Sequence, residues 1–228
     1  MMLKIFDNKF KNKSYPDYWN RYLNLFADKQ NFEIPISQGN FVVVDVESTG
    51  LNPKKDRILS IGALKIHNNE IFVKESFEIY IQQSAYNPES ARIHGIIKNG
   101  RIQKFSETDA MKMFIEYIRS DIIVGHSITF DITILNVTLK RIVGDKLKNK
   151  ILDTIELYKR LKGGDFRLGD STSLDKLCDE FNIPKSDRHT ASGDALITGI
   201  LFLKIISRLR ERKVLTIKEL FKTKNFLL

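Results

Sequence analysis

The spacing of apolar residues along the chain changes between the two-residue period of strands and the 3.6-residue period of helices. The runs that fit strands are 41–46, 57–66, 71–81 and 122–126. The runs that fit helices are 107–119, 130–143, 173–181 and 193–212. Asn68 and Asn69 give a turn signal between the second and third strands, and Thr172 with Asp175 offers a capping box for the third helix. Three strands in antiparallel order, followed by strands alternating with helices, predict a mixed α/β sheet.

Both ends of the chain lie outside this pattern, so we expect a helical extension over residues 1–38, a main domain over 39–212 and a basic and apolar tail over 213–228. Pro16 suits the first turn of a helix in the extension. The apolar face of that helix would carry Trp19, Tyr22, Leu23 and Phe26. We expect this face to cover the core of the same chain rather than to dock onto a partner. In the tail, Thr216-Ile217-Lys218-Glu219 predicts a capping box and a short helix.

Four acidic residues and one histidine stand at the ends of the predicted elements: Asp45, Glu47, Asp131, His189 and Asp194. Asp45 and Glu47 share one face of the first strand, because alternate residues of a strand point the same way. Asp131 lies in the first turn of the second helix, and His189 precedes Asp194 at the start of the last one. Functional residues concentrate at such element ends.

Carboxylates that converge need a counter-charge. Two unit charges ~4 Å apart repel by about 1 kcal/mol in water and by ~4 kcal/mol at an effective dielectric of 20, and every pair of the four acids would repel in this way. Oxygen ligands with few His or Cys select Mg²⁺ or Mn²⁺ over zinc. The acids therefore predict two such ions roughly 3.5 to 4 Å apart, an arrangement that suits phosphodiester hydrolysis. Neutral His189 suits the general base that takes a proton from the attacking water.

The segments around these residues resemble the three motifs of DEDDh 3′-5′ exonucleases, most of all those of the bacterial proofreading enzymes. The matching segments are Asp-Val-Glu-Ser-Thr-Gly-Leu-Asn-Pro at 45–53, Gly-His-Ser-Ile-Thr-Phe-Asp at 125–131 and His-Thr-Ala-Ser-Gly-Asp at 189–194. Segments 56–64 and 92–96 are also similar to that family. The similarity covers residues 40 to 205, in the order that the family has.

The resemblance implies a ribonuclease H-like fold with a mixed five-stranded sheet flanked by helices. It assigns metal binding to the four acids and the role of general base to His189. The candidate substrate-binding residues are Thr49, Gly50, Leu51, His94 and His126. In the family, the residues matching Thr49 and His94 lie beside the terminal nucleotide. His126 ends an apolar strand, and that place alone favours a hydrogen-bonded packing role. Ser127 stands where the family often carries Asn, and we expect this difference to alter substrate positioning rather than metal binding.

The function that this resemblance implies is metal-dependent 3′-5′ hydrolysis of single-stranded or mismatched DNA ends to nucleoside 5′-monophosphates, in proofreading or repair. One alternative is an RNA 3′-end trimming enzyme similar to ribonuclease T or oligoribonuclease. Contacts to the 2′-OH would distinguish RNA, but no residue of the sequence can be assigned to them. The other alternative is a non-catalytic nucleic-acid-binding module of a replication complex. The intact set of four acids and one histidine speaks against that.

The net charge of +9 is unevenly placed. Residues 140–167 contain nine Lys or Arg against four acids, and residues 204–228 contain eight against two. Phosphate backbones are the natural partners of such stretches, so single-stranded DNA or RNA is expected to bind. For the loop at 159–164, substrate contact and a merely solvated surface fit equally well. A DNA polymerase subunit is a further expected partner, through the N-terminal extension or the tail.

The remaining composition is typical of a cytoplasmic protein. The single cysteine, Cys178, lies on an apolar helical stripe and reads as core packing in a reducing compartment. Early charges interrupt the apolar start of the chain, and Lys204 and Arg208 interrupt its most apolar helix. We therefore expect neither a signal peptide nor a membrane span.

Overall fold

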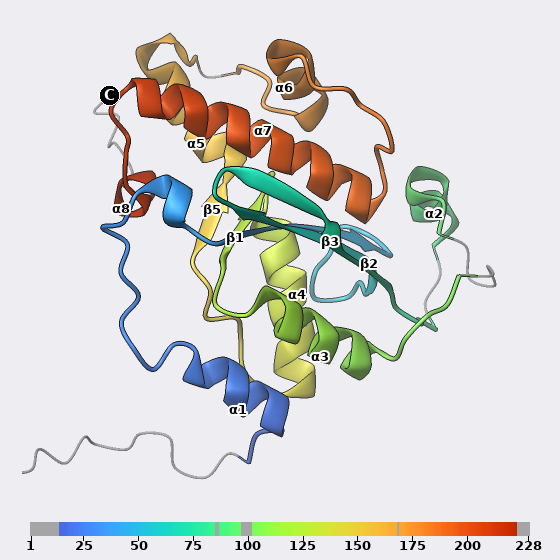
Figure 1. Cartoon of the computed structure of the whole chain (residues 1–228). Coiled ribbons are helices and arrows are strands. Elements are labelled where there is room, and N and C mark those ends of the chain that lie inside the picture. Colours follow the sequence, from blue (N-terminus) through green and yellow to red (C-terminus); the bar gives the residue numbers. More distant parts are fainter. Residues whose placement is uncertain (1–13, 85–86, 97–101, 168, 223–228) are drawn as a thin grey trace, which may run out of the picture.

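The computed structural model of the chain describes residues 14–84, 87–96, 102–167 and 169–222 (Figure 1). Its strands are β1 (Phe41–Ser48), β2 (Ile58–His67), β3 (Glu70–Tyr80), β4 (Ile122–Gly125) and β5 (Ile151–Asp153). Its α-helices are α1 (Asp17–Asn24), α2 (Pro88–His94), α3 (Glu107–Ile118), α4 (Thr129–Ile142), α5 (Thr154–Lys162), α6 (Leu174–Phe181), α7 (Ala191–Glu211) and α8 (Ile217–Leu220). Short 3₁₀ turns lie at Ile36–Gln38 and Gly163–Asp165.

The five strands form one mixed sheet in the order β3-β2-β1-β4-β5. β1 pairs antiparallel with β2, and β2 pairs antiparallel with β3. β4 runs parallel to β1 and to β5. The mixed five-stranded sheet expected from the sequence is therefore confirmed. Because β1, β4 and β5 are parallel, their carboxyl ends lie along one edge of the sheet, where open α/β sheets commonly bind ligands.

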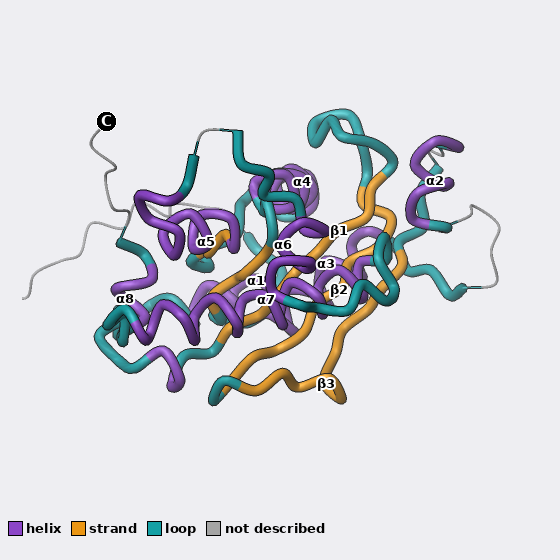
Figure 2. Tube along the Cα trace, turned by 90° about the horizontal axis from the view of Figure 1, so that it is seen from above, coloured by secondary structure: helices purple, strands orange, loops and turns teal. Residues whose placement is uncertain are grey.

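Helices cover both faces of this sheet (Figures 1 and 2). The alternation of β1 sorts its side chains, so that Val42 and Val44 pack with α3 and α4 while Phe41 and Val43 pack with α5, α6 and α7. Asp45 and Glu47 continue the register of Val43 and so belong to the α7 face. The strand pattern thus delivers two acids to the side of the sheet where the longest helix lies.

The predicted elements agree with the structure to within one or two residues at their ends. The capping box predicted from Thr172 and Asp175 is wrong. Ser173 is the N-cap of α6, because its side chain accepts the backbone N–H of Lys176. Asp175 instead accepts from Arg188. Cys178 is buried on α6, as its apolar stripe predicted.

Three elements had no predicted range: α2, β5 and α5. β5 has only three residues, too few for a two-residue period to show. α5 buries Leu157 and Leu161, but four of its nine residues are charged. The sequence of this segment was therefore interpreted as a charged surface. Its N-cap, Asp153, accepts the backbone N–H of Ile155. A three-residue strand followed directly by a capped helix leaves little apolar signal in the sequence.

Two helices outside the predicted main domain, α1 and α8, pack onto it. α1 lies against α3, with Trp19 fully buried, and the Tyr22 hydroxyl donates to Asn149 at 2.6 Å. The prediction that this helix covers the core of its own chain is confirmed. At the other end, Ile217 and Leu220 of α8 are buried, and the predicted capping box of Thr216 and Glu219 is present. None of the described helices combines the length and the apolar character needed to cross a bilayer.

Candidate active site

Three of the predicted acids meet at the carboxyl end of β1. One carboxylate oxygen from each of Asp45, Glu47 and Asp194 lies within 4.8 Å of the others. Asp45 and Glu47 come from β1, and Asp194 comes from the first turn of α7. Residues 149 positions apart in the sequence therefore form one acidic cluster.

Asp131 belongs to the same neighbourhood but stands slightly apart from these three. It lies buried in the first turn of α4 and accepts the backbone N–H of Val46, the residue between Asp45 and Glu47. Its charge contributes to the raised pKa values of Asp45 and of Glu47. The structure thus brings together all four acids that the sequence singled out.

A glycine on β2 lets α7 come this close to the sheet. Gly62 is the register partner of Asp45, and a Cβ at Gly62 would stand 2.2 Å from the backbone of Ala191, the first residue of α7. Backbone atoms cannot give way at that distance. A side chain at Gly62 would therefore push the start of α7, and Asp194 with it, away from β1.

The turn that carries His189 is held by similar means. A Cβ at Gly193 would stand 2.0 Å from the carbonyl oxygen of Asp187. Thr190, the N-cap of α7, accepts the backbone N–H of Gly193 and donates to the Asp187 carbonyl. His189 adopts a φ of 65° in this turn, a left-handed conformation that non-glycine residues rarely take. Its backbone N–H points to the Asp194 carboxylate at 3.4 Å, and its side chain is exposed.

Arg188 is a site residue that the sequence reasoning missed. Its guanidinium donates to Asp194 and, at 2.9 Å, to Asp175 of α6. Its side chain is 16% exposed, so this cation is mostly withdrawn from water and lies among the acids. The only signal in the sequence was its place directly before His189.

Burial and mutual repulsion raise the pKa values of the clustered acids. For Asp45, desolvation and then the charges of Asp131, Asp194 and Glu47 hold the pKa well above its usual range. Desolvation also raises the pKa of Glu47 to about 7, with Asp194 and Asp131 adding to the effect. Burial raises the pKa of Asp131 to about 7. Arg188 lowers the pKa values of Asp45 and Glu47 without cancelling these increases.

This donor set fits divalent cations. Carboxylate oxygens are hard ligands of the kind that Mg²⁺ and Mn²⁺ prefer, and three of them already lie within 4.8 Å of one another. Raised pKa values show that the single guanidinium of Arg188 leaves the cluster short of positive charge. The cluster is thus suited to binding metal, and its chemistry does not by itself choose between the two ions.

The loop after β1 forms one flank of the site. The Thr49 hydroxyl donates to Asp56 at 2.9 Å, and a Cβ at Gly50 would collide with that same carboxylate. Leu51 is 88% exposed at the tip of the loop. The amide of Asn87, which is the N-cap of α2, donates to the Thr49 carbonyl at 3.0 Å. The substrate-binding residues predicted at 49–51 and on α2 therefore belong to two segments that are tied together.

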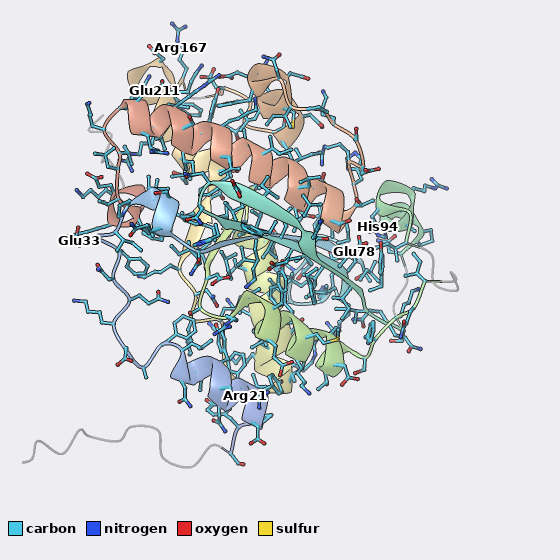
Figure 3. The ribbon with its side chains drawn as sticks, viewed as in Figure 1. Arg21, Glu33, Glu78, His94, Arg167 and Glu211 are labelled. Atoms are coloured by element: carbon cyan, nitrogen blue, oxygen red, sulfur yellow. The ribbon has the colours of Figure 1, made fainter. Side chains whose placement is uncertain are left out.

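His94 ends α2 on this side of the molecule. Figure 3 shows it with Glu78 on the side where α7 begins, and the Ser192 hydroxyl of α7 donates to Glu78 at 2.6 Å. The backbone N–H of Ile96 donates to Nδ1 of His94, so the ring proton sits on Nε2. That Nε2 is buried and has no hydrogen-bond partner among the described residues. Burial lowers the pKa of His94, so the ring stays neutral.

His126 and Ser127 form the opposite flank, at the end of β4. Nδ1 of His126 lies 2.8 Å from the Thr154 hydroxyl, and burial lowers the pKa of the ring. Ser127 has a φ of 54°, and its backbone N–H donates to Asp153 at 3.1 Å. Asp153 also accepts from the backbone N–H groups of Ile128 and Ile155. This aspartate, which the sequence reasoning did not single out, fixes the turn that leads to Asp131.

A hollow of about 390 Å³ opens over the cluster between α6 and the end of β4. Its lining includes Asp45, His126, Ser127, Arg188 and Asp194. Pockets of about 300 Å³ and more accommodate small organic ligands. Asp45 and Asp194 therefore face a space with room for a nucleotide-sized group.

Comparison with known proteins agrees with this geometry. Residues 42–202 match the family model described as Exonuclease. The chain is 33% identical to DNA polymerase III subunit epsilon of Buchnera aphidicola over 72% of this chain and 68% of that protein. It is 30% identical to the PolC-type DNA polymerase III of Thermotoga maritima over 81% of this chain, but it spans only 13% of that relative's length.

Among solved structures, E. coli exonuclease I in complex with a dA16 oligonucleotide superposes with a TM-score of 0.66. The match has 18% sequence identity and covers 76% of this chain and 42% of that chain. This likeness confirms the ribonuclease H-like fold. With the family model covering all four clustered acids and His189, the chain belongs to the exonuclease family that its motifs resemble.

Proposed function

We propose that this chain is a metal-dependent 3′-5′ exonuclease that shortens single-stranded or mismatched DNA 3′ ends and releases nucleoside 5′-monophosphates. The observation that carries the proposal is the convergence of Asp45, Glu47 and Asp194 within 4.8 Å, with Asp131 buried beside them. The relatives named as DNA polymerase III proteins support DNA as the substrate and a DNA polymerase as the partner.

In this proposal the four acids hold two Mg²⁺ or Mn²⁺ ions. When bound, such ions activate a water molecule and stabilise the charge on the attacking and leaving oxygens. Arg188 lies within the same cluster, so its guanidinium is the internal cation that balances Asp194 when metal is absent. When metal ions bind Asp194, Arg188 can keep its ion pair with the second carboxylate, that of Asp175 on α6.

His189 takes the proton from the attacking water. Its turn is anchored to Asp194 through its own backbone N–H and to Gly193 through the Thr190 cap, and its imidazole is exposed. An exposed imidazole can pass the proton on to solvent.

The flanks of the site position the terminal nucleotide. Thr49 and Gly50 hold the loop on Asp56, and the exposed Leu51 offers an apolar contact to a base. We assign to the substrate the Nε2–H of His94, which is buried and has no hydrogen-bond partner among the described residues. His126 is bonded to Thr154, so we assign it the support of this flank rather than direct binding. Melting a paired end costs stacking energy, so unpaired ends should enter more easily.

The test is hydrolysis of four 5′-labelled substrates with Mg²⁺: a single DNA strand, the RNA strand of the same sequence, a fully paired DNA duplex, and the same duplex with a 3′ mismatch. We expect single-nucleotide shortening of DNA from the 3′ end, faster for the mismatched than for the paired duplex. Asp45→Ala is the control for contaminating nucleases. Equal rates on matched and mismatched ends would contradict proofreading, and preference for the RNA strand would assign the chain to RNA trimming instead.

A further inference from the structure

A second concave surface runs along the β5 edge of the sheet. It consists of two hollows of about 450 and 700 Å³ that share Phe221. We call this surface the β5-edge groove. Its cationic lining consists of Lys29, Lys148, Lys150, Lys159, Arg160, Lys218 and Lys222, and its aromatic lining of Phe26, Phe32 and Phe221.

Three segments that are far apart in the sequence build most of this groove, 26–32, 148–160 and 218–222, and Ile128 and Thr129 complete the lining of the first hollow. In Figure 1, the segment that follows α1 rises past β5 to reach α8. The backbone bridge between Pro35 and Thr216 holds these two segments together. The first and third segments lie outside residues 42–202, which match the exonuclease family. Segments 26–32 and 218–222 therefore add this groove to the shared domain.

Charge distinguishes the groove from the acidic cluster. Seven cationic side chains line it against three acidic ones, Asp28, Asp153 and Glu156. Asp153 is already engaged by three backbone N–H groups. Lys29 and Lys150 are exposed and form no ion pair within the described part of the chain. Both basic stretches that stand out in the sequence thus contribute to one surface.

The other lysines of the groove are held in weak pairs. Lys148 contacts Asp145, and Lys218 contacts Glu33, which Figure 3 shows on the side of the molecule away from His94. Exposed ion pairs contribute little free energy, so a phosphate can replace one of these carboxylates at low cost. Between the cations, the rings of Phe32 and Phe221 meet edge to face at 5.7 Å and are only partly buried. Cations interleaved with accessible rings are the pattern of single-strand binding surfaces.

The groove begins close to the acidic cluster. Its first hollow is lined by Ile128 and Thr129, at the start of the helix that carries Asp131, and by Asp153. From there it follows β5, whose three residues span about 10 Å, to the second hollow at Lys148 and Lys150. A strand that leaves the hollow over the acidic cluster past Ser127 would reach this groove at Ile128.

We propose that the β5-edge groove binds the upstream part of a single-stranded nucleic acid whose 3′ end lies at the acidic cluster. This inference rests on the proposed function. The lysines contact successive phosphates, and the phenyl rings contact bases without regard to sequence. An acidic peptide is the other class of ligand that such a surface could take. The continuity of the groove with the start of α4 favours the strand.

The experiment compares two double variants of the full chain that change the net charge equally. Lys29→Glu with Lys150→Glu reverses the two unpaired lysines of the groove. Lys74→Glu with Lys112→Glu reverses two exposed lysines on β3 and α3, away from the groove. Binding of fluorescein-labelled oligothymidylate of about 20 nucleotides is measured by anisotropy in EDTA, so that no hydrolysis occurs. Circular dichroism melts of both variants verify that they fold.

We expect the groove variant to bind this strand about tenfold more weakly than the control variant. The dependence of log affinity on log salt should also become shallower by about 1.4, because two phosphate contacts are lost. With Mg²⁺, the ratio of kcat/KM for the long strand to kcat/KM for a dinucleotide should fall in the groove variant only.

Equal affinities of the two variants for the strand would overturn the proposal. Loss of binding to a labelled hexa-aspartate peptide, with strand binding intact, would also overturn it and assign the groove to a protein partner. The failure of the proposed function looks different, because a wild-type chain that hydrolyses neither substrate with Mg²⁺ still gives a clear binding result in EDTA.

Discussion

The acidic cluster and the β5-edge groove differ in how the fold holds their charges. In the cluster, four carboxylates are drawn together against their own repulsion, and the backbone around them is fixed by Gly62, Gly193 and the Thr190 cap. In the groove, exposed lysines stand on loops and short elements, where water already screens them. The comparison teaches that buried like charges need a rigid backbone around them to hold them together. Exposed cations need only to lie along one surface.

The sharpest way to break this comparison is to remove one charge from the cluster. Asp45→Asn should lower the rate of hydrolysis about a thousandfold, because it removes a metal ligand. The same change should raise the melting temperature of the metal-free chain, since the charged form of Asp45 is disfavoured in the fold. Glu70→Gln, at an exposed position on β3, is the control and should change neither quantity. A lower melting temperature for Asp45→Asn would show that the acids do not repel one another as described.

This rigid backbone can be tested without touching a charge. Gly62→Ala should destabilise the chain by about 3 kcal/mol, because its Cβ meets the backbone at the start of α7. Hydrolysis should fall with it, since Asp194 moves with α7. Gly164→Ala places a Cβ in open space and is the matched control. Urea denaturation and the rate on a short strand measure both effects, and a Gly62→Ala variant as stable as Gly164→Ala would refute the close approach.

Arg188 should stabilise the metal-free chain more than the metal-bound chain. Arg188→Gln removes the cation paired with Asp194 and Asp175, and should cost about 1 to 2 kcal/mol in EDTA. The cost stays below that of a fully buried pair because Asp175 is half exposed. Saturating Mg²⁺ should then raise the melting temperature more in Arg188→Gln than in wild type. Arg188→Lys keeps the charge and should lie between them, whereas an unchanged response to Mg²⁺ would exclude Arg188 from charge balance in the cluster.

The repulsion among the clustered acids should also appear in the pH dependence of stability. The pKa values of Glu47 and Asp131 are raised to about 7, so the folded chain binds more protons than the unfolded chain, and stability falls as pH rises toward 8. His94 and His126, whose pKa values burial lowers, act in the opposite direction only below about pH 6.5. Melting temperatures in EDTA should therefore fall by a few degrees between about pH 6.5 and pH 8. Mg²⁺ or Glu47→Gln should reduce the fall, and a rise over this window would contradict the assigned shifts.

The sequence predicted the cluster better than the groove, for a physical reason. A two-residue period on β1 places Asp45 and Glu47 on one face whatever the rest of the chain does. First-turn positions on two long apolar helices place Asp131 and Asp194 almost as firmly. Each of these inferences needs only local periodicity. The resemblance to a known family then brought the segments together.

Arg188 and the groove depend on tertiary contacts that no local pattern reports. Arg188 could equally have faced solvent from its turn, and only the approach of α6 brings Asp175 to it. Phe32 and Phe221 meet because the two ends of the chain pair through Pro35 and Thr216. Charge counts showed that the basic stretches existed, but not that they share one surface.

The smallest effects distinguish the two regions most cleanly, because the same substitution can be made in each. Thr190 caps α7 beside the cluster, and Thr216 caps α8 beside the groove. Each side chain accepts the backbone N–H three residues ahead, so Thr→Ala should cost about 1 kcal/mol at either position. The functional consequences should nevertheless separate.

Thr190→Ala loosens the turn of His189 and should slow hydrolysis of a dinucleotide, with little change in binding of a long strand in EDTA. Thr216→Ala loosens α8, which carries Lys218 and adjoins Phe221, so it should weaken long-strand binding two- to threefold. Its thermal stability should be about equal to that of Thr190→Ala. Point substitution is preferable to deleting residues 214–228, because Val214, Ile217 and Leu220 are buried in the core. Equal slowing of the dinucleotide reaction in both threonine variants would contradict a separate role for the groove. It would mean that destabilising α8 disturbs the acidic cluster through the shared core.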